Sequence, residues 1–305
     1  MILLKRWCKK WQSILVDAIS FVGIFWLFVE IASYSTNGKA DLYLKSISVF
    51  TSIFILIVIL AVFKNKPKNS FGAHLRNKDN YLEIKVGDAF ENKGALIVPV
   101  NDQFDMSLGG NVSKANSIQN QLIQKFYSGK TEHLNTDIST KITVGQKCDI
   151  GTTIEIEQKS EAFGNKKFYL VANSIKQNNN RVLSEIDHFI QALNGLWNYI
   201  GLSSGRDAAV TIPIINTQHG RDSYLSRMAA IKEIITSYIE ASKSLNICEK
   251  LIISIHPNDL KKGNIDLDEL EEYLKYSCKH YRQVILNGKK VGEEATASKV
   301  IKIDN

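Results

Sequence analysis

The sequence predicts an α/β protein: a mainly parallel sheet covered by helices on both faces, preceded by a two-helix transmembrane hairpin. Three observations lead to this fold class. Apolar runs long enough to cross a membrane, about 20 residues, lie near the N-terminus. From residue 81 onward, short strand patterns alternate with helix patterns, which is typical of sheets built from strand–helix–strand units. The 305 residues, 44% of them hydrophobic, provide one sizeable folded domain besides the hairpin.

The hairpin is assigned to residues 1–63, with helices at about 14–33 and 46–63. Each run is close to the roughly 20 residues that a bilayer core requires. Lysines and arginines precede the first run and follow the second, whereas the connecting loop has few, so the positive-inside rule places both termini in the cytoplasm. The first run is too long and too acidic for a signal peptide.

Two acids within the first run, Asp17 and Glu30, allow two interpretations. Near the ends of a membrane helix, an acid commonly lies among the lipid headgroups and has no special role. Alternatively, in an oligomer, both acids face a polar interior and help to line a pore.

Residues 64–80 are charged, rich in asparagine and interrupted by Pro67 and Gly72, which predicts a juxtamembrane linker. The first 78 residues carry 11 basic and 3 acidic side chains, and the rest of the chain carries 27 and 28. The positive charge therefore favours a membrane surface, and the domain at 81–305 lacks the basic surface of a nucleic-acid-binding protein.

The domain begins with two strands and a polar loop. Residues 81–86 alternate between apolar and polar and end at the turn pair Gly87-Asp88. Residues 95–100 are a continuous apolar run, as in a strand buried on both faces. Ligands of open α/β sheets bind beyond the carboxyl ends of strands. Here the polar residues Asn101, Asp102, Gln103 and Asp105 follow, together with Phe104 and the glycines Gly109 and Gly110. Ser113 is a candidate cap for the next helix.

The remaining elements alternate between strand and helix. After a helix-like piece at 135–142, we predict strands at 148–157, 167–172, 208–213, 250–255 and 284–286, and helices at 182–200, 224–245 and 266–281, the last capped by Asp266. A loop at 214–222 follows the strand at 208–213, so it lies at the same edge of the sheet as the first polar loop.

Three segments together resemble a known family: Gly87-Asp88-Ala89-Phe90, then Asn101 with Phe104-Asp105, then Ser117-Ile118-Gln119. They are similar to the macrodomain of type II Thoeris antiphage defence effectors, the ThsA family, which also carry two N-terminal transmembrane helices. Gly151-Thr152 matches a Gly-Thr pair of that family. In the 214–222 loop, Thr217, Gly220 and Arg221 match its phosphate-binding pattern, and Asn216 and Gln218 replace two glycines.

The resemblance implies a macrodomain fold and an ADP-ribose-type ligand. Asp88 would accept a hydrogen bond from the adenine amino group, which suits an acceptor-only carboxylate. The implied ligand-binding residues are Asp88, Ala89, Asn101, Phe104, Asp105, Gly109, Gly110, Ser117, Thr217, Gly220 and Arg221. Without the resemblance, Asp88 would be interpreted as an ordinary turn residue.

By the same resemblance, the chain would be a sensor in the bacterial inner membrane, multi-pass, with its macrodomain in the cytoplasm. The signal would be an ADP-ribose derivative, histidine-ADP-ribose, made by a partner protein with a TIR domain. Binding would drive homo-oligomerisation and disruption of the lipid bilayer.

Signals for an enzyme are weak. The six histidines and four cysteines have no metal-ligand spacing, and the chain has no HExxH or Walker A motif. We therefore expect no catalytic residue, no metal and no cofactor. Two alternatives stay open: a membrane-tethered ADP-ribosyl hydrolase that uses Asn101, and a passive scaffold without a ligand.

Overall fold

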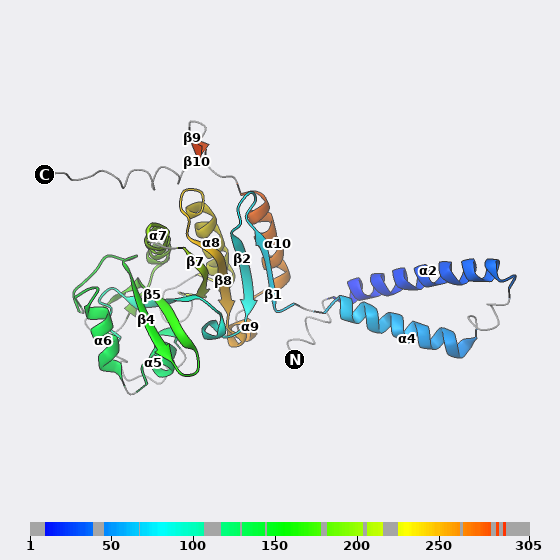
Figure 1. Cartoon of the computed structure of the whole chain (residues 1–305), viewed down its shortest axis with the longest axis horizontal. Helices are drawn as coiled ribbons and strands as arrows, with labels where there is room; N and C mark the ends of the chain where they lie inside the picture. The colour runs from blue at the N-terminus through cyan, green and yellow to red at the C-terminus, as the bar shows by residue number, and fades with distance from the viewer. Residues whose placement is uncertain are drawn as a thin grey trace. The chain divides into compact units, whose positions relative to one another are not determined.

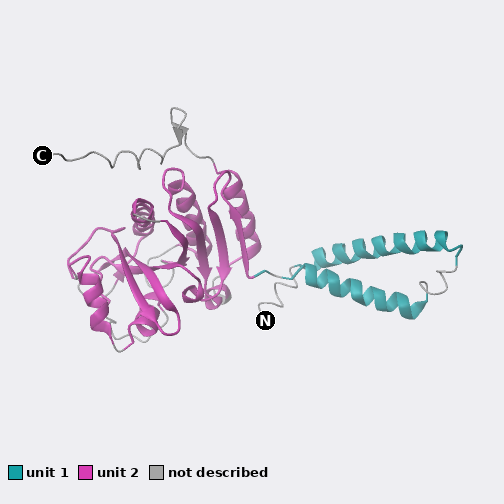
Figure 2. Cartoon of the chain, viewed as in Figure 1, with its two compact units in different colours: residues 1–68 teal, residues 69–305 magenta. Residues whose placement is uncertain are grey.

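The computed structural model describes residues 10–38, 46–66, 68–106, 117–128, 130–143, 145–177, 182–203, 206–215, 225–262, 265–281, 285–286 and 289–290. The chain divides into two compact units, Met1–Lys68 and Asn69–Asn305, which Figure 2 shows in different colours.

The described residues of the first unit form two helices, α2 (Trp11–Ser35) and α4 (Ile47–Lys64). Both are long and apolar enough to cross a membrane, by length and composition. Their large apolar side chains are mostly exposed, and among the described residues of the two helices only Val29, Ile57 and Ala61 are buried. Exposed apolar surface around a whole helix is typical of contact with lipid rather than water.

A polar contact joins α2 and α4. The Asp17 carboxylate accepts hydrogen bonds from Lys64 Nζ and Asn65 Nδ2, both at 2.7 Å. Lys64 and Asn65 stand at the end of α4, so the start of α2 and the end of α4 meet. Asp17 is therefore paired inside its own hairpin.

The second unit is built on an eight-stranded mixed sheet (Figure 1). Five neighbouring strands are parallel, and an antiparallel strand lies at each end. The order is β1 (Ser70–His74), β2 (Tyr81–Val86), β8 (Cys248–Ile255), β7 (Asp207–Pro213), β3 (Ala95–Asn101), β5 (Gly164–Lys176) and β4 (Thr153–Ser160), with β6 (Val182–Leu183) paired to β5.

Strand β1 lies inside the stretch that the sequence assigned to a linker. It pairs antiparallel with β2, and Phe71 and the following Leu75 are buried against the sheet. The asparagines and charges around these few apolar residues hide the strand pattern in the sequence. The folded domain thus begins at about Asn69, whose carbonyl accepts a hydrogen bond from Val86 N at 2.8 Å.

Two apolar clusters cover the two faces of the sheet. Alternate residues of β3 divide between them: Ala95 and Ile97 point to one cluster, and Leu96, Val98 and Val100 to the other. Helices α7 (Ile186–Leu202), α8 (Arg227–Ala241) and α10 (Leu267–Lys279) pack on the first face, and α5 (Ile118–Phe126) and α6 (Thr131–Ser139) on the second. The predicted covering on both faces is confirmed.

Several predicted boundaries change. The predicted helix at 182–200 begins only at Ile186, because Val182–Leu183 pairs with β5 as β6. Ser117, not Ser113, caps α5, with its hydroxyl accepting from Asn120 N at 3.1 Å. The predicted cap of α10 is confirmed, since Asp266 accepts from two backbone N–H groups. Strand β9 (Ile285–Leu286) pairs with β10 (Lys289–Lys290) outside the main sheet, and the short helix α9 (Pro257–Lys262) was not predicted.

Gly151, of the Gly-Thr pair, lies where the chain crosses closely over α7. Its φ is +92°, and a Cβ there would lie 2.8 Å from Gln191 O and 3.3 Å from Gly195 Cα. A Cβ on Gly195 would lie 2.3 Å from Gly151 O. The backbones therefore touch, and this contact explains the two glycines.

We expect Gly151→Ala to lower the free energy of unfolding by about 3 kcal/mol, from an unfavourable φ together with a backbone clash. Gly145→Ala is the matched control, because its φ is +85° but nothing lies within 4 Å of its Cβ. The control should cost only about 1 to 2 kcal/mol, the penalty of the left-handed conformation. Denaturant unfolding measures both, and equal losses would contradict the close crossing.

Candidate ligand-binding site

The polar residues predicted for the site follow the carboxyl ends of parallel strands. Asp88 comes two residues after β2, and Asn101 is the last residue of β3; His256, which was not among the predicted site residues, follows β8. Because these strands are parallel, their carboxyl ends lie along one edge of the sheet. The sequence thus placed its candidates at the edge where α/β sheets bind ligands.

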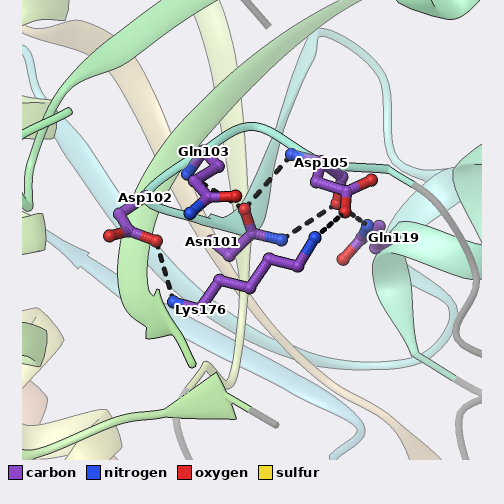
Figure 3. A network of polar contacts seen from close by, with 6 residues as sticks. All are labelled: Asn101, Asp102, Gln103, Asp105, Gln119 and Lys176. Carbon is purple, nitrogen blue, oxygen red and sulfur yellow. Dashed lines mark hydrogen bonds and ion pairs between the residues drawn. The ribbon is translucent and has the colours of Figure 1, made fainter. Parts of the chain in front are cut away.

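Asn101 organises the loop after β3 (Figure 3). Its Oδ1 accepts hydrogen bonds from Gln103 N at 3.0 Å and Asp105 N at 3.1 Å, and its Nδ2 donates to Asp105 O at 2.9 Å. An asparagine side chain that bonds the backbone two and four residues ahead fixes a tight turn. The amide of Asn101 is therefore used to shape the loop, and Asn101 is a positioning residue.

Asp102 and Lys176 tie this loop to β5. The Asp102 side chain is almost fully buried, and its Oδ1 accepts a hydrogen bond from Lys176 N at 2.8 Å. The Lys176 ammonium forms an ion pair with Asp105, and Figure 3 shows this lysine reaching across Asn101. The predicted residue Asp105 is consequently neutralised by a lysine that the sequence did not single out.

Phe104 and Ala89 are buried. Phe104 has no exposed surface and packs in the apolar cluster under α5, with a φ of +51° that is unusual for a bulky side chain. Ala89, in a short 3₁₀ turn, is 5% exposed. Any ligand contact of these two residues would therefore come from their backbone.

Asp88 sits in the turn that leads from β2 toward β3. Its Oδ1 accepts from Phe90 N at 3.0 Å, and its Oδ2 pairs with Lys125 Nζ of α5 at 2.5 Å. Partial burial disfavours the charged form, but the hydrogen bonds from Lys125 and Phe90 outweigh it, with smaller help from His256, and hold the pKa of Asp88 below its ordinary value. Asp88 is therefore an ionised, acceptor-only group with part of its surface exposed.

A buried lysine also donates hydrogen bonds to the backbone of the same turn. Lys166 of β5 is 6% exposed, and its Nζ donates to Phe90 O at 3.1 Å and Asn92 O at 2.6 Å. Burial lowers the pKa of this ammonium, while the nearby charge of Asp88 opposes that shift. The alternation of β5 contains the signal, because Lys166 shares a face with the buried Phe168 and Leu170.

Helix α5 connects the two halves of the candidate site. Near its start, Gln119 Nε2 donates to Asp105 O at 3.3 Å in the Asn101 loop, and near its end Lys125 pairs with Asp88. Six residues of α-helix rise about 9 Å. One rigid element therefore fixes the spacing between the loop after β3 and the Asp88 turn. The predicted Ser117 acts here as the cap of that helix.

The other predicted site residues lie outside the described part of the chain. They are Gly109 and Gly110 of the first loop, and Thr217, Gly220 and Arg221 of the second, together with Asn216 and Gln218. Their binding roles stay predictions.

The described residues offer acceptors and cations rather than a metal centre. No group of three or more His, Cys, Asp or Glu side chains that could hold a metal occurs within the described ranges. Burial raises the pKa of the Cys248 thiol to about 12 and that of Cys278 to about 11, so both remain protonated and unreactive at neutral pH.

The segment that carries these features also matches a protein family. The family described as "Thoeris protein ThsA, Macro domain" matches residues 82–256, more than half of the chain. The chain belongs to this family. The ThsA macro domain match begins in β2, ends just after β8, and includes Asp88, the Asn101 loop, α5 and Lys166. The predicted macrodomain fold is therefore confirmed.

Among solved structures, this ThsA-family chain is similar to a macrodomain from Oceanobacillus iheyensis. The form with MES bound has 14% identity and a TM-score of 0.46, over 67% of this chain and 97% of that chain. A point mutant with ADPR has 14% identity and a TM-score of 0.47, over 67% and 99%. The form with ADP has 14% identity and a TM-score of 0.37, over 67% and 97%. No curated protein sequence matches the chain.

Proposed function

We propose that this protein is a membrane-anchored sensor whose macrodomain binds an ADP-ribose-type ligand. The observation that carries the proposal is Asp88, an ionised carboxylate at the ligand-binding edge of a ThsA macro domain. An ionised carboxylate accepts hydrogen bonds and donates none, which matches the exocyclic amino group of adenine. Solved structures of another macrodomain, with ADPR and with ADP, agree with this ligand class.

In this proposal, the two apolar helices hold the macrodomain at the bacterial inner membrane, and ligand binding drives self-assembly that disrupts the bilayer. The ligand is histidine-ADP-ribose, supplied by a TIR-domain partner. Assembly follows binding only if the assembled state has the higher affinity for the ligand, because equal affinities shift no equilibrium. A preference of roughly 10⁴-fold would turn a 1:99 population into 99:1.

Titration calorimetry of the full chain in detergent micelles tests ligand binding. We expect saturable binding of ADP-ribose and tighter binding of histidine-ADP-ribose. The absence of heat with either ligand, together with unchanged thermal stability, would contradict the proposal and favour a passive scaffold, because a ligand that binds only the folded state raises its stability.

The same samples separate a sensor from a hydrolase. Since the Asn101 amide already bonds the backbone of its own loop, it has little capacity left to orient a reacting water. We expect chromatography to recover the ligand intact after long incubation. Steady release of products would instead support an ADP-ribosyl hydrolase.

A further inference from the structure

Two lysines on separate elements hold the Asp88 turn, one at the carboxylate and one at the backbone. Lys125 of α5 contacts its Oδ2 at 2.5 Å, and the buried Lys166 of β5 fixes the carbonyls of Phe90 and Asn92 in the same turn. Phe90 N occupies Oδ1. The orientation of the carboxylate therefore depends on partners that lie outside its own turn.

Lys125 itself has little freedom. Its ammonium lies 4.4 Å from the ring centre of Phe90 and 5.2 Å from that of Phe163, besides the contact with Asp88. An ammonium between two aromatic faces and a carboxylate is attracted by all three. Its side chain is only about a quarter exposed, so solvent screens these attractions less than at an open surface.

We propose that Lys125 determines specificity for a 6-aminopurine, by fixing Asp88 as an oriented hydrogen-bond acceptor. This inference rests on the proposed function and names the group within the ligand that the site recognises. A carboxylate accepts from the amino group of adenine but repels the 6-oxo group of hypoxanthine. Without Lys125, only the hydrogen bond from Phe90 N still holds the carboxylate, through Oδ1. Oδ2 loses its partner, and burial shifts the balance toward the protonated form, which can donate to an oxo group.

The test compares the affinity of the full chain in detergent for ADP-ribose and for inosine diphosphate ribose. The wild type should prefer ADP-ribose by roughly 10- to 100-fold, the range of one hydrogen bond to a charged group. Lys125→Met keeps an apolar side chain between Phe90 and Phe163 and removes the charge. We expect it to reduce this preference at least about fivefold.

Lys232→Met is the matched control. Lys232 on α8 makes the same two kinds of contact, an ion pair with Glu269 at 2.6 Å and a position 5.2 Å from the ring centre of Tyr273. Its loss should leave the ratio of the two affinities unchanged. We choose the ratio of the two affinities as the readout because general destabilisation of the protein weakens the binding of both ligands alike.

The pH profile gives a second readout. The groups that act on Asp88 are Lys125, Lys166, His256 and the Phe90 amide, from four elements. With Lys125 present, the Asp88 pKa is depressed, so the preference should stay constant from pH 7 to pH 5. In Lys125→Met, the lowering by Lys125 is lost while burial still acts against the charged form, so the Asp88 pKa should rise relative to the wild type and the preference should begin to fall at a higher pH. His256 is common to both proteins and cancels from the comparison.

The outcomes separate this inference from the proposed function. An unchanged or increased preference in Lys125→Met would overturn the inference, because Lys125 would then be neutral or would obstruct Asp88. Wild-type binding without preference for the aminopurine would overturn it and leave ADP-ribose binding intact. Failure of the wild type to bind either compound would overturn the proposed function, and the inference with it.

Discussion

Replacing Asp88 with alanine should weaken ADP-ribose binding by roughly 10- to 100-fold, since a hydrogen bond to a charged group contributes about 1.5 to 3 kcal/mol. The variant also leaves Lys125 Nζ without its carboxylate and Phe90 N without its side-chain acceptor. The turn after β2 thereby loses two of the contacts that fix its conformation. Titration calorimetry of the full chain measures the change.

Asp266→Ala is the control for the structural part of that effect. Asp266 also accepts from backbone N–H groups, as the cap of α10, but it follows no strand at the ligand edge. Loss of a helix cap costs about 1 kcal/mol of stability. Both variants should therefore lose stability, but only Asp88→Ala should lose affinity. Equal affinities for Asp88→Ala and wild type would reduce Asp88 to an ordinary turn residue.

Removing the first unit should change the location of the protein completely. On an insertion scale, each Leu, Ile, Phe or Val in a membrane helix contributes roughly 0.3 to 0.6 kcal/mol, and α2 and α4 consist largely of such residues. The full chain should stay in the membrane pellet after alkaline carbonate extraction, whereas a chain that begins at Asn69 should appear in the supernatant.

The truncated chain needs its own check, because insoluble protein also pellets. It retains β1, whose Phe71 belongs to the apolar core, so it should unfold cooperatively and still bind ADP-ribose. Extraction of the full chain by carbonate would contradict membrane spanning. Pelleting of a folded truncated chain would show that the macrodomain itself binds the membrane.

Periodicity and turn chemistry are enough to predict most of this fold. The alternation of β2, the apolar run of β3 and the Asp266 cap are local signals, and the structure agrees with each. Strand β1 has only one strongly apolar residue, Phe71, among small and polar ones, and its pairing with β2 is a tertiary contact. Val182–Leu183 likewise becomes a strand because β5 offers it a partner.

The site residues also divide into those that local sequence signals predict and those that depend on tertiary contacts. Asp88 and Asn101 were predicted because they stand next to strand ends and belong to recognisable segments. Lys125, Lys166 and Lys176 lie 37, 76 and 71 residues from the groups they contact, Asp88, Phe90 and Asp105. The sequence around a lysine does not show which distant residue it will contact. Only the burial of Lys166 could have been predicted locally, from its place on the buried face of β5.

Dye release from lipid vesicles that contain the full chain is the most direct test of the membrane-anchored sensor. The account predicts that the vesicles stay sealed without ligand, that histidine-ADP-ribose triggers release, and that Asp88→Ala abolishes the response at the same ligand concentration. Release that is independent of ligand, or saturable binding that never leads to release, would contradict the coupling of the macrodomain to the membrane helices.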